Sequence, residues 1–244
     1  MQQLVDRAVL RVRRERVNLE TLASNCLFNR VADEICDRLE DYGHGDGCGM
    51  VVVSGQPEFW DRRFGPSEHV TDGETLALTP ESHDRVLHCM ALHWSNDPVG
   101  QLIQCRLALK PGGMFLGALF GGETLFELRE AFLAAEIGIH GGVSPRVLPM
   151  ADVRALGDLL PRAGLVRGVA DRIAVRKYYP TVLGLMHELR DLGETNAMAD
   201  RVQTPGRRDM FKRLQSVYHE RFANTEGQIP ATFEIIFLTG WRNV

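Results

Sequence analysis

The 244-residue sequence has little cysteine, no excess of positive charge and no long hydrophobic run. Its five cysteines are odd in number and show no CxxC spacing, which argues against a disulfide framework and a structural zinc site and favours a reducing compartment. The formal net charge of −4 removes the usual reason to expect a nucleic-acid-binding protein. No apolar run approaches the ~20 residues that cross a bilayer, so no transmembrane segment is predicted.

The N-terminal region also lacks the pattern of a targeting segment. Charged residues stand where a signal peptide would place its apolar part, and the acids Asp6 and Glu15 count against an organellar transit peptide. We therefore expect a cytoplasmic protein. Basic residues gather at 11–16 and 207–213, where each group could meet an acidic partner, although a solvated helix face explains them more simply.

Apolar strands alternate with amphipathic helices along the chain, which predicts an α/β fold built on a parallel sheet. Strands are expected at 50–53, 68–72, 84–93, 114–120, 166–178 and 232–238, and helices at 1–41, 98–109, 123–136, 151–163, 181–192 and 207–222. We interpret residues 1–42 as an N-terminal helical segment and residues 43–244 as the main domain, with a helical insertion near 180–222. The glycine-rich stretch Gly43–Gly49 separates the two.

The most distinctive stretch is Leu107–Gly117, which runs from a helix end through a Pro-Gly-Gly turn into a buried strand. Physically it is a connection that any doubly wound sheet could use. As a sequence it resembles the segment before the fifth strand of class I S-adenosylmethionine-dependent methyltransferases.

Five further motifs make the resemblance closer, because they occur here in a single order: Ala91–Asp97, Phe120–Arg129, Gly141–Pro145, Asp191–Asn196 and Ala231–Trp241. Together they are similar to one subfamily, the methyltransferase-like assembly factors of respiratory complex I and their alphaproteobacterial relatives. Those relatives are commonly labelled as resembling the biotin-pathway malonyl-carrier methyltransferase. The match covers residues 84–244, about two thirds of the chain.

This resemblance implies a Rossmann-like class I methyltransferase fold, with a mainly parallel sheet, helices on both faces and an antiparallel last strand. It also implies S-adenosylmethionine as the cofactor and a protein substrate, such as a subunit of complex I. Mitochondrial members of the subfamily are associated with arginine hydroxylation of a complex I subunit, which makes a protein arginine hydroxylase an alternative to a methyltransferase.

The turn that should hold the cofactor departs from the family pattern. In this fold the first strand leads into an acidic, glycine-rich turn, and an acid after the second strand holds the ribose hydroxyls. Here the apolar strand leads into Ser54-Gly55-Gln56-Pro57, where a single glycine remains and the acid is missing. Pro57 has no N–H to offer a ligand. The sequence therefore predicts weak cofactor binding.

The chain is also short between this turn and the next acidic cluster. Only the 16 residues 56–71 separate Gly55 from Asp72. A crossover connection needs at least ~10–12 residues, so one fits and two do not, and the sheet is expected to be one strand short. The resemblance places Asp72 and Glu74 where the family carries acids that reach the adenine. An ordinary turn aspartate is the alternative for Asp72.

Polar and aromatic residues stand at the end of the strand predicted at 84–93, at the edge where open α/β sheets bind ligands. His93 could act as a general base, with Asp97 as its local partner, and Trp94 could stack on the adenine. The simpler interpretation makes Trp94 a core residue and Asn96 or Asp97 the cap of the helix that begins at Pro98. Strand alternation would place His88 and His93 on opposite faces, so no metal site is predicted.

A second group of candidates lies in later loops. Gly121 and Gly122 permit close approach of a ligand, and Glu123 or Thr124 could cap backbone N–H groups at the next helix start. Four further residues could form a lid or a substrate wall: Ser144, Arg146, Glu194 and Asn196.

Two functional hypotheses follow. One is an S-adenosylmethionine-dependent enzyme that modifies a protein during complex I assembly. The other is a degenerate, non-catalytic assembly or binding factor on the same fold, which the altered turn and the short sheet favour. A nicotinamide-dependent oxidoreductase has little support, because GxGxxG is absent.

Overall fold

The computed structural model describes residues 3–43, 49–65, 67–140, 142–202 and 208–244. The chain forms two compact units, which are described separately. Unit 1 comprises residues 1–17, 122–150 and 174–234, and unit 2 comprises residues 18–121, 151–173 and 235–244. The long strands β5 (Leu165–Tyr179) and β6 (Ile229–Arg242) contribute residues to both.

Unit 2 is built on a mainly parallel sheet. Its strands are β1 (Met50–Ser54), β2 (Glu68–Thr71), β3 (His83–Cys89) and β4 (Leu109–Phe120), and the order in the sheet is β2-β1-β3-β4-β6-β5. The first four are parallel neighbours, and β6 pairs with β4 in the antiparallel sense. The predicted fold class is therefore confirmed. Among the described residues, β2 is the single strand between β1 and β3 in the sequence, as the short 56–71 spacing predicts.

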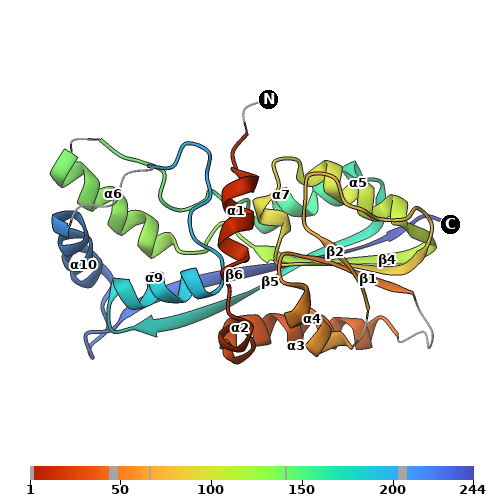
Figure 1. The fold of residues 1–244 in the computed structure, drawn as a ribbon, viewed down its shortest axis with the longest axis horizontal. Coiled ribbons are helices and arrows are strands. Elements are labelled where there is room, and N and C mark those ends of the chain that lie inside the picture. Colours follow the sequence, from red (N-terminus) through yellow and green to blue (C-terminus); the bar gives the residue numbers. More distant parts are fainter. Residues whose placement is uncertain (1–2, 44–48, 66, 141, 203–207) are drawn as a thin grey trace. The chain divides into compact units, whose positions relative to one another are not determined.

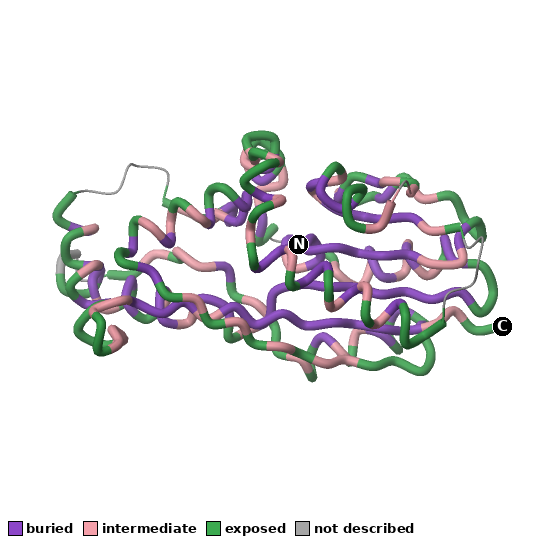
Figure 2. Tube along the Cα trace, turned by 90° about the horizontal axis from the view of Figure 1, so that it is seen from below, coloured by how far each residue is buried: buried purple, intermediate pink, exposed green. Residues whose placement is uncertain are grey.

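Helices cover both faces of this sheet (Figure 1). On one side lie α3 (Cys26–Asp41) and α4 (Pro57–Phe64), and on the other lie α5 (Pro98–Ala108) and α7 (Val153–Gly157). Strand β1 is apolar and buried, since Val51, Val52 and Val53 are all 0% exposed. Figure 2 shows buried backbone concentrated in the strands. This is the pattern expected where both faces of a parallel sheet are covered.

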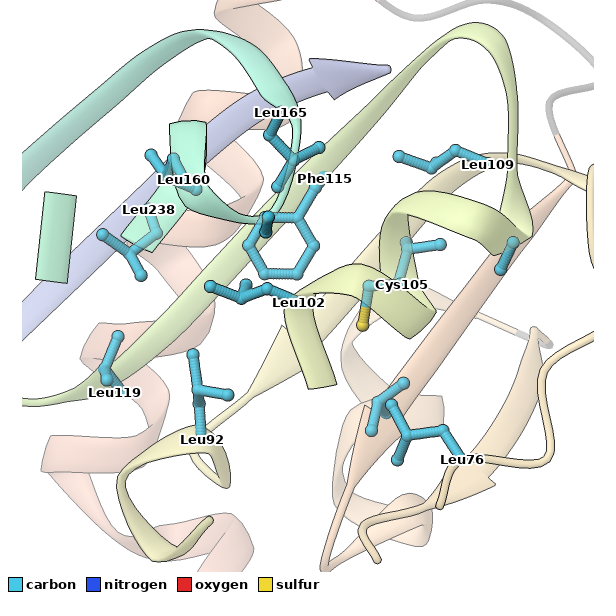
Figure 3. Packing of buried hydrophobic residues seen from close by; sticks show 14 of the residues in the cluster. Leu76, Leu92, Leu102, Cys105, Leu109, Phe115, Leu119, Leu160, Leu165 and Leu238 are labelled. Carbon is cyan, nitrogen blue, oxygen red and sulfur yellow. The ribbon is translucent and has the colours of Figure 1, made fainter. Parts of the chain in front are cut away.

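The α5 side of the sheet holds a continuous apolar core (Figure 3). Leu102 and Cys105 of α5 pack with Phe115 of β4, and α8 (Leu159–Arg162) adds Leu160 to the same cluster. Truncating a buried leucine in such a core typically costs ~2–5 kcal/mol of stability. The core therefore fixes the position of α5, whose polar side chains matter below.

Three boundaries differ from the sequence-based expectation. The third strand ends at Cys89, and His93 lies in a 3-10 turn, η1 (Leu92–Trp94), so strand alternation does not apply to it. Strand β4 begins at Leu109, earlier than expected. Its pairing with β3 passes from Leu109 directly to Met114, so residues 110–113 bulge out of the ladder. The predicted helix 151–163 is two short helices, α7 and α8, that meet at Asp158.

The N-terminal helical region is likewise interrupted. It forms α1 (Arg7–Arg14), α2 (Leu19–Ser24) and α3, since Asn18 and Asn25 cap the second and third helices with their side chains. Such caps favour a new helix start over continuation of the previous one. The glycine-rich stretch before β1 lies mainly outside the described residues.

Unit 1 is largely helical. It contains α1, α6 (Phe126–His140), α9 (Val182–Asp191) and α10 (Arg208–Phe222), together with ends of β5 and β6. The buried Tyr218 hydroxyl donates to the Pro230 carbonyl at 2.7 Å, and the Gln215 side chain accepts from the N–H of Val182 at 2.8 Å. These bonds tie α10 to β6 and to the start of α9. No helix in the described ranges is long and apolar enough to cross a membrane.

Candidate active site

Four predicted residues follow four parallel strands of unit 2. Gly55 comes after β1, Asp72 after β2, His93 in the turn after β3 and Gly121 directly after β4. Because β2, β1, β3 and β4 run parallel, these carboxyl ends lie at one edge of the sheet, which is where open α/β sheets bind ligands. The structure thus places all four at the expected edge.

Direct contacts join the chain segments that carry these four residues. The Asp72 N–H donates to the Ser54 carbonyl at 2.9 Å, which ties the chain after β2 to the end of β1. The rings of His93 and Phe120 meet edge to face with centroids 5.0 Å apart, and the Phe120 N–H lies 3.5 Å from His93 Nδ1. The ends of β3 and β4 are therefore in contact as well.

The turn after β1 offers little backbone to a ligand. Helix α4 begins at Pro57, so its first residue has no N–H, and the Gln56 side chain makes no capping bond at the helix start. The Ser54 hydroxyl is buried without a hydrogen-bond partner among the described residues. The helix behind the turn carries two buried aromatic residues, Phe59 and Trp60, which pack edge to face.

The chain after β2 is held far more closely. We call residues Asp72–Leu76 the acidic segment and the carboxamides of Asn96, Gln101 and Gln104 the amide clamp. Gln101 Nε2 donates to the Gly73 carbonyl at 2.6 Å and to Asp72 Oδ1 at 3.3 Å. Asn96 Nδ2 donates to a Glu74 carboxylate oxygen at 2.8 Å.

The third amide completes the clamp. Gln104 Nε2 donates to the Glu74 carbonyl at 3.1 Å, and Gln104 Oε1 accepts from the Leu76 N–H at 2.7 Å. The sequence prediction missed Gln101 and Gln104. The signal available was their spacing of three on one helix, which places both side chains on the same face.

The interpretation of Asp97 as a cap is confirmed. Its Oδ1 accepts from the Gly100 N–H at 2.8 Å, at the start of α5 with Pro98 as the first residue. A Cβ on Gly100 would lie 2.2 Å from Asp97 Oδ2, so a larger residue there would displace the capping carboxylate. Trp94 is only 2% exposed, which agrees with a core residue. Whether His93 and Asp97 take part in a reaction remains a prediction.

In unit 1, the predicted lid residues gather around a carboxylate that sequence reasoning missed. Glu136 is 2% exposed and accepts from the Ser144 N–H at 2.7 Å and from Arg146 Nε at 2.7 Å. Asn196 Nδ2 donates to the Pro145 carbonyl at 2.9 Å, and Arg13 of α1 donates to the Asn196 carbonyl. Ser144, Arg146 and Asn196 are therefore linked, as a wall or lid would require.

The remaining unit 1 candidates have structural partners. Thr124 does not cap its own helix as expected, because its hydroxyl donates to the Glu234 carbonyl at 3.0 Å and accepts from the Glu234 N–H at 3.1 Å. The Glu234 side chain accepts from the Glu123 N–H at 3.0 Å instead. Gly122 is partly exposed, and Glu194, 8% exposed, follows the end of α9.

Two cysteines of unit 2, Cys89 and Cys105, are buried, and neither is poised as a nucleophile. Burial raises the pKa of the Cys89 thiol at the end of β3. Burial also raises the pKa of the Cys105 thiol on α5, and the negative charge of Asp72 adds to this shift. Both thiols therefore stay protonated at neutral pH.

A groove of about 630 Å³ lies elsewhere in unit 2, between the short helices α7 and α8 and the beginning of β5. Its lining includes Arg154, Leu160 and Arg167 and contains none of the predicted site residues. It is therefore separate from the candidate active site.

Comparison with known proteins agrees with this geometry. Residues 35–117 match the family model described as a methyltransferase domain. Over these residues the chain therefore carries a methyltransferase-type domain. A crystal structure from Bacillus halodurans assigned as a methyltransferase superposes with a TM-score of 0.52 at 14% identity, covering 85% of this chain and 98% of the other, which supports the fold alone.

Named relatives confirm the resemblance found from the motifs. This methyltransferase-type chain is 38% identical over 173 residues to "Arginine-hydroxylase NDUFAF5, mitochondrial" of Danio rerio, covering 71% of the chain and 54% of the relative. For the Homo sapiens protein of the same name the identity is also 38%, over 71% of the chain and 50% of the relative. "Malonyl-[acyl-carrier protein] O-methyltransferase" of Xylella fastidiosa is 32% identical, over 70% and 55%. The chain thus spans about half the length of these relatives.

Proposed function

We propose that the chain binds S-adenosylmethionine at the carboxyl edge of the unit 2 sheet and modifies a protein side chain during complex I assembly. The observation that carries the proposal is the position of Gly55, Asp72, His93 and Gly121, each in the chain that follows a parallel strand at that edge. The relatives' names, an arginine hydroxylase and a carrier-protein methyltransferase, support a protein substrate.

The residues at this edge fit the cofactor in part. Asp72, 8% exposed, is an acid at the end of the strand next to β1, and with Glu74 it would bind the adenosine end of the cofactor. Gly55 leaves room for close approach of the backbone. Pro57 removes one N–H, so the backbone contribution is small and Asp72 would carry an unusual share of recognition.

The role of His93 depends on its ring nitrogens. S-adenosylmethionine, when bound, supplies an electrophilic methyl group, and a base at the edge would take the proton that the substrate loses. His93 Nδ1 faces the Phe120 N–H, so the neutral ring would carry its proton at Nε2. In that state Nε2 donates a hydrogen bond and orients a substrate. Loss of the long 3.5 Å contact would free Nδ1 as the base.

We further propose that loops of unit 1 contact the substrate. The linked residues Ser144, Arg146 and Asn196 would form the wall, and Glu194 and Gly122–Thr124 would border it. The Arg146 guanidinium lies 5.6 Å above the Phe132 ring, and the same arginine pairs with Glu136, so its orientation is fixed from two sides.

The alternative is a non-catalytic binding or assembly factor on the same fold. It is favoured by Pro57 at the start of α4 and by the use of Asp97 as a helix cap. An arginine hydroxylase, as the relatives are named, is a further alternative. We propose a cytoplasmic location for this chain, whereas the names of two relatives specify mitochondria.

Titration calorimetry tests the proposal on the purified chain with S-adenosylmethionine and S-adenosylhomocysteine. We expect saturable but weak binding, lost in Asp72→Ala and kept in Asp84→Ala. Asp84 is a matched control because it lies at the opposite, amino end of β3, where it pairs with Lys110. No binding by the wild type would leave the assembly factor. Low-micromolar binding that survives Asp72→Ala would show that the cofactor site lies elsewhere.

A further inference from the structure

One side chain of the amide clamp reaches deeper than the other two. Gln101 is 1% exposed and connects the acidic segment to the interior, because its Oε1 lies 3.0 Å from Nε2 of His88. His88, on β3, is 0% exposed. A single carboxamide therefore contacts Asp72, Gly73 and His88.

The chemistry of these partners fixes the orientation of the amide. The Gly73 carbonyl and an ionised Asp72 carboxylate can only accept hydrogen bonds, so the NH₂ group of Gln101 must face them. Its oxygen then faces His88, whose Nε2 must carry a proton. In the flipped orientation the Gln101 oxygen would face the acceptors on Gly73 and Asp72. The hydrogen bond from His88 to the Gln101 oxygen therefore favours the observed orientation.

The backbone and the side chain of Asp72 are held by different groups. The Asp72 N–H is bound to the Ser54 carbonyl, so the main chain stays in place without Gln101. The carboxylate is bound through Gln101 Nε2. Loss of that donor would remove this hydrogen bond from the carboxylate and leave the main-chain bond in place.

We propose that Gln101 is a positioning residue that holds the Asp72 carboxylate in the orientation in which it binds the cofactor, with His88 fixing the amide of Gln101. This assignment rests on the proposed function, because it presupposes that Asp72 meets S-adenosylmethionine. It extends the site from the sheet edge to a buried histidine that does not itself contact the ligand.

Gln104 provides a matched control. It belongs to the same helix and clamps the same acidic segment, but its bonds run to the main chain of Glu74 and Leu76. If Gln101 merely stiffens the segment, replacing either glutamine by methionine should weaken binding equally. If it positions the carboxylate, Gln101→Met should have the larger effect.

The test combines calorimetry with carbon-13 NMR of aspartate side chains. We expect Gln101→Met to weaken S-adenosylmethionine binding by about tenfold, the equivalent of ~1.4 kcal/mol, and Gln104→Met to change it by less than about twofold. Adding S-adenosylmethionine should shift the Asp72 carboxyl carbon of the wild type, and this shift should be absent from saturated Gln101→Met. A structural role alone would preserve that shift at saturation. Equal losses in the two variants, or a preserved shift, would overturn the assignment.

Gln101→Glu keeps the shape and the acceptor for His88 but removes both donors, so it serves if Gln101→Met does not fold. It should bind at least as weakly as Gln101→Met, because it sets two carboxylates side by side. Wild-type affinity in a folded Gln101→Glu would contradict the assignment while leaving the proposed function intact. Absence of binding by the wild type would overturn both.

Discussion

The turn Ser54–Pro57 and the acidic segment follow neighbouring strands at the same edge, yet they are organised in opposite ways. The turn enters α4 at once through a proline, so it presents few backbone donors. The acidic segment is held by three carboxamides, and its first residue is an acid that is 8% exposed. The contrast teaches that order at this edge comes from carboxamide side chains that bind the acidic segment, where the fold usually relies on a glycine-rich backbone.

The largest expected effect compares the two segments directly. Asp72→Ala should weaken S-adenosylmethionine binding by roughly ten- to a hundredfold, since a lost hydrogen bond to a charged group is worth ~1.5–3 kcal/mol. Gly55→Ala should change it by less than about threefold, because the turn, which enters α4 through Pro57, offers few backbone donors. Calorimetry on both variants decides. A larger loss in Gly55→Ala would reverse the comparison and restore the turn as the principal site.

A smaller effect should come from repairing the turn. Pro57→Ala restores an N–H at the first position of α4, where helix N-termini bind anionic groups. One added hydrogen bond is typically worth ~0.5–1.5 kcal/mol, so affinity should rise by about two- to tenfold. Circular dichroism checks that α4 is retained. Unchanged affinity would mean that the cofactor's carboxylate does not approach this helix start.

Much of this comparison could be drawn from sequence. The apolar run Val51–Val53, the single proline and the 16-residue spacing to Asp72 predicted a poor turn and one crossover, and the structure contains one. The resemblance supplied the sheet and the antiparallel last strand. The clamp was not predictable, because a glutamine that binds main-chain carbonyls 28 or 30 residues away has no local pattern. The partner of Thr124 was not predictable for the same reason, since Glu234 on β6 is 110 residues away.

Asp97 caps α5, the helix that carries Gln101 and Gln104, so its substitution tests how far the acidic segment depends on that helix. Asp97→Ala should cost about 1 kcal/mol by removing the cap of α5, which lowers the melting temperature by roughly 2–4 °C in a chain of this size. Asp97→Asn should restore the stability and the melting temperature, because asparagine caps equally well. Thermal denaturation measures the capping role, and calorimetry measures any effect on cofactor binding. Loss of catalytic turnover in a fully stable Asp97→Asn would show that the carboxylate takes part in the reaction.

The smallest expected effect is a change in the labelling rates of two buried cysteines, which report how often the turn and the acidic segment open. Cys89 pairs with Ser54 across β1 and β3, and Cys105 packs in the same apolar cluster as Leu76 of the acidic segment. Both thiols have a raised pKa and are buried, so each should react with iodoacetamide only when its surroundings open. Removing one amide of the clamp in Gln104→Met should increase the labelling rate of Cys105 by a few fold, since Leu76 loses the acceptor for its N–H. Cys89 should keep its rate, because the bond between Asp72 N–H and the Ser54 carbonyl does not involve the clamp.

Peptide mass spectrometry resolves the two sites, with exposed Cys26 as the internal standard for reagent activity. Equal acceleration at both thiols would mean that the turn and the acidic segment open as one unit, and the distinction between them would then describe contacts but not stability.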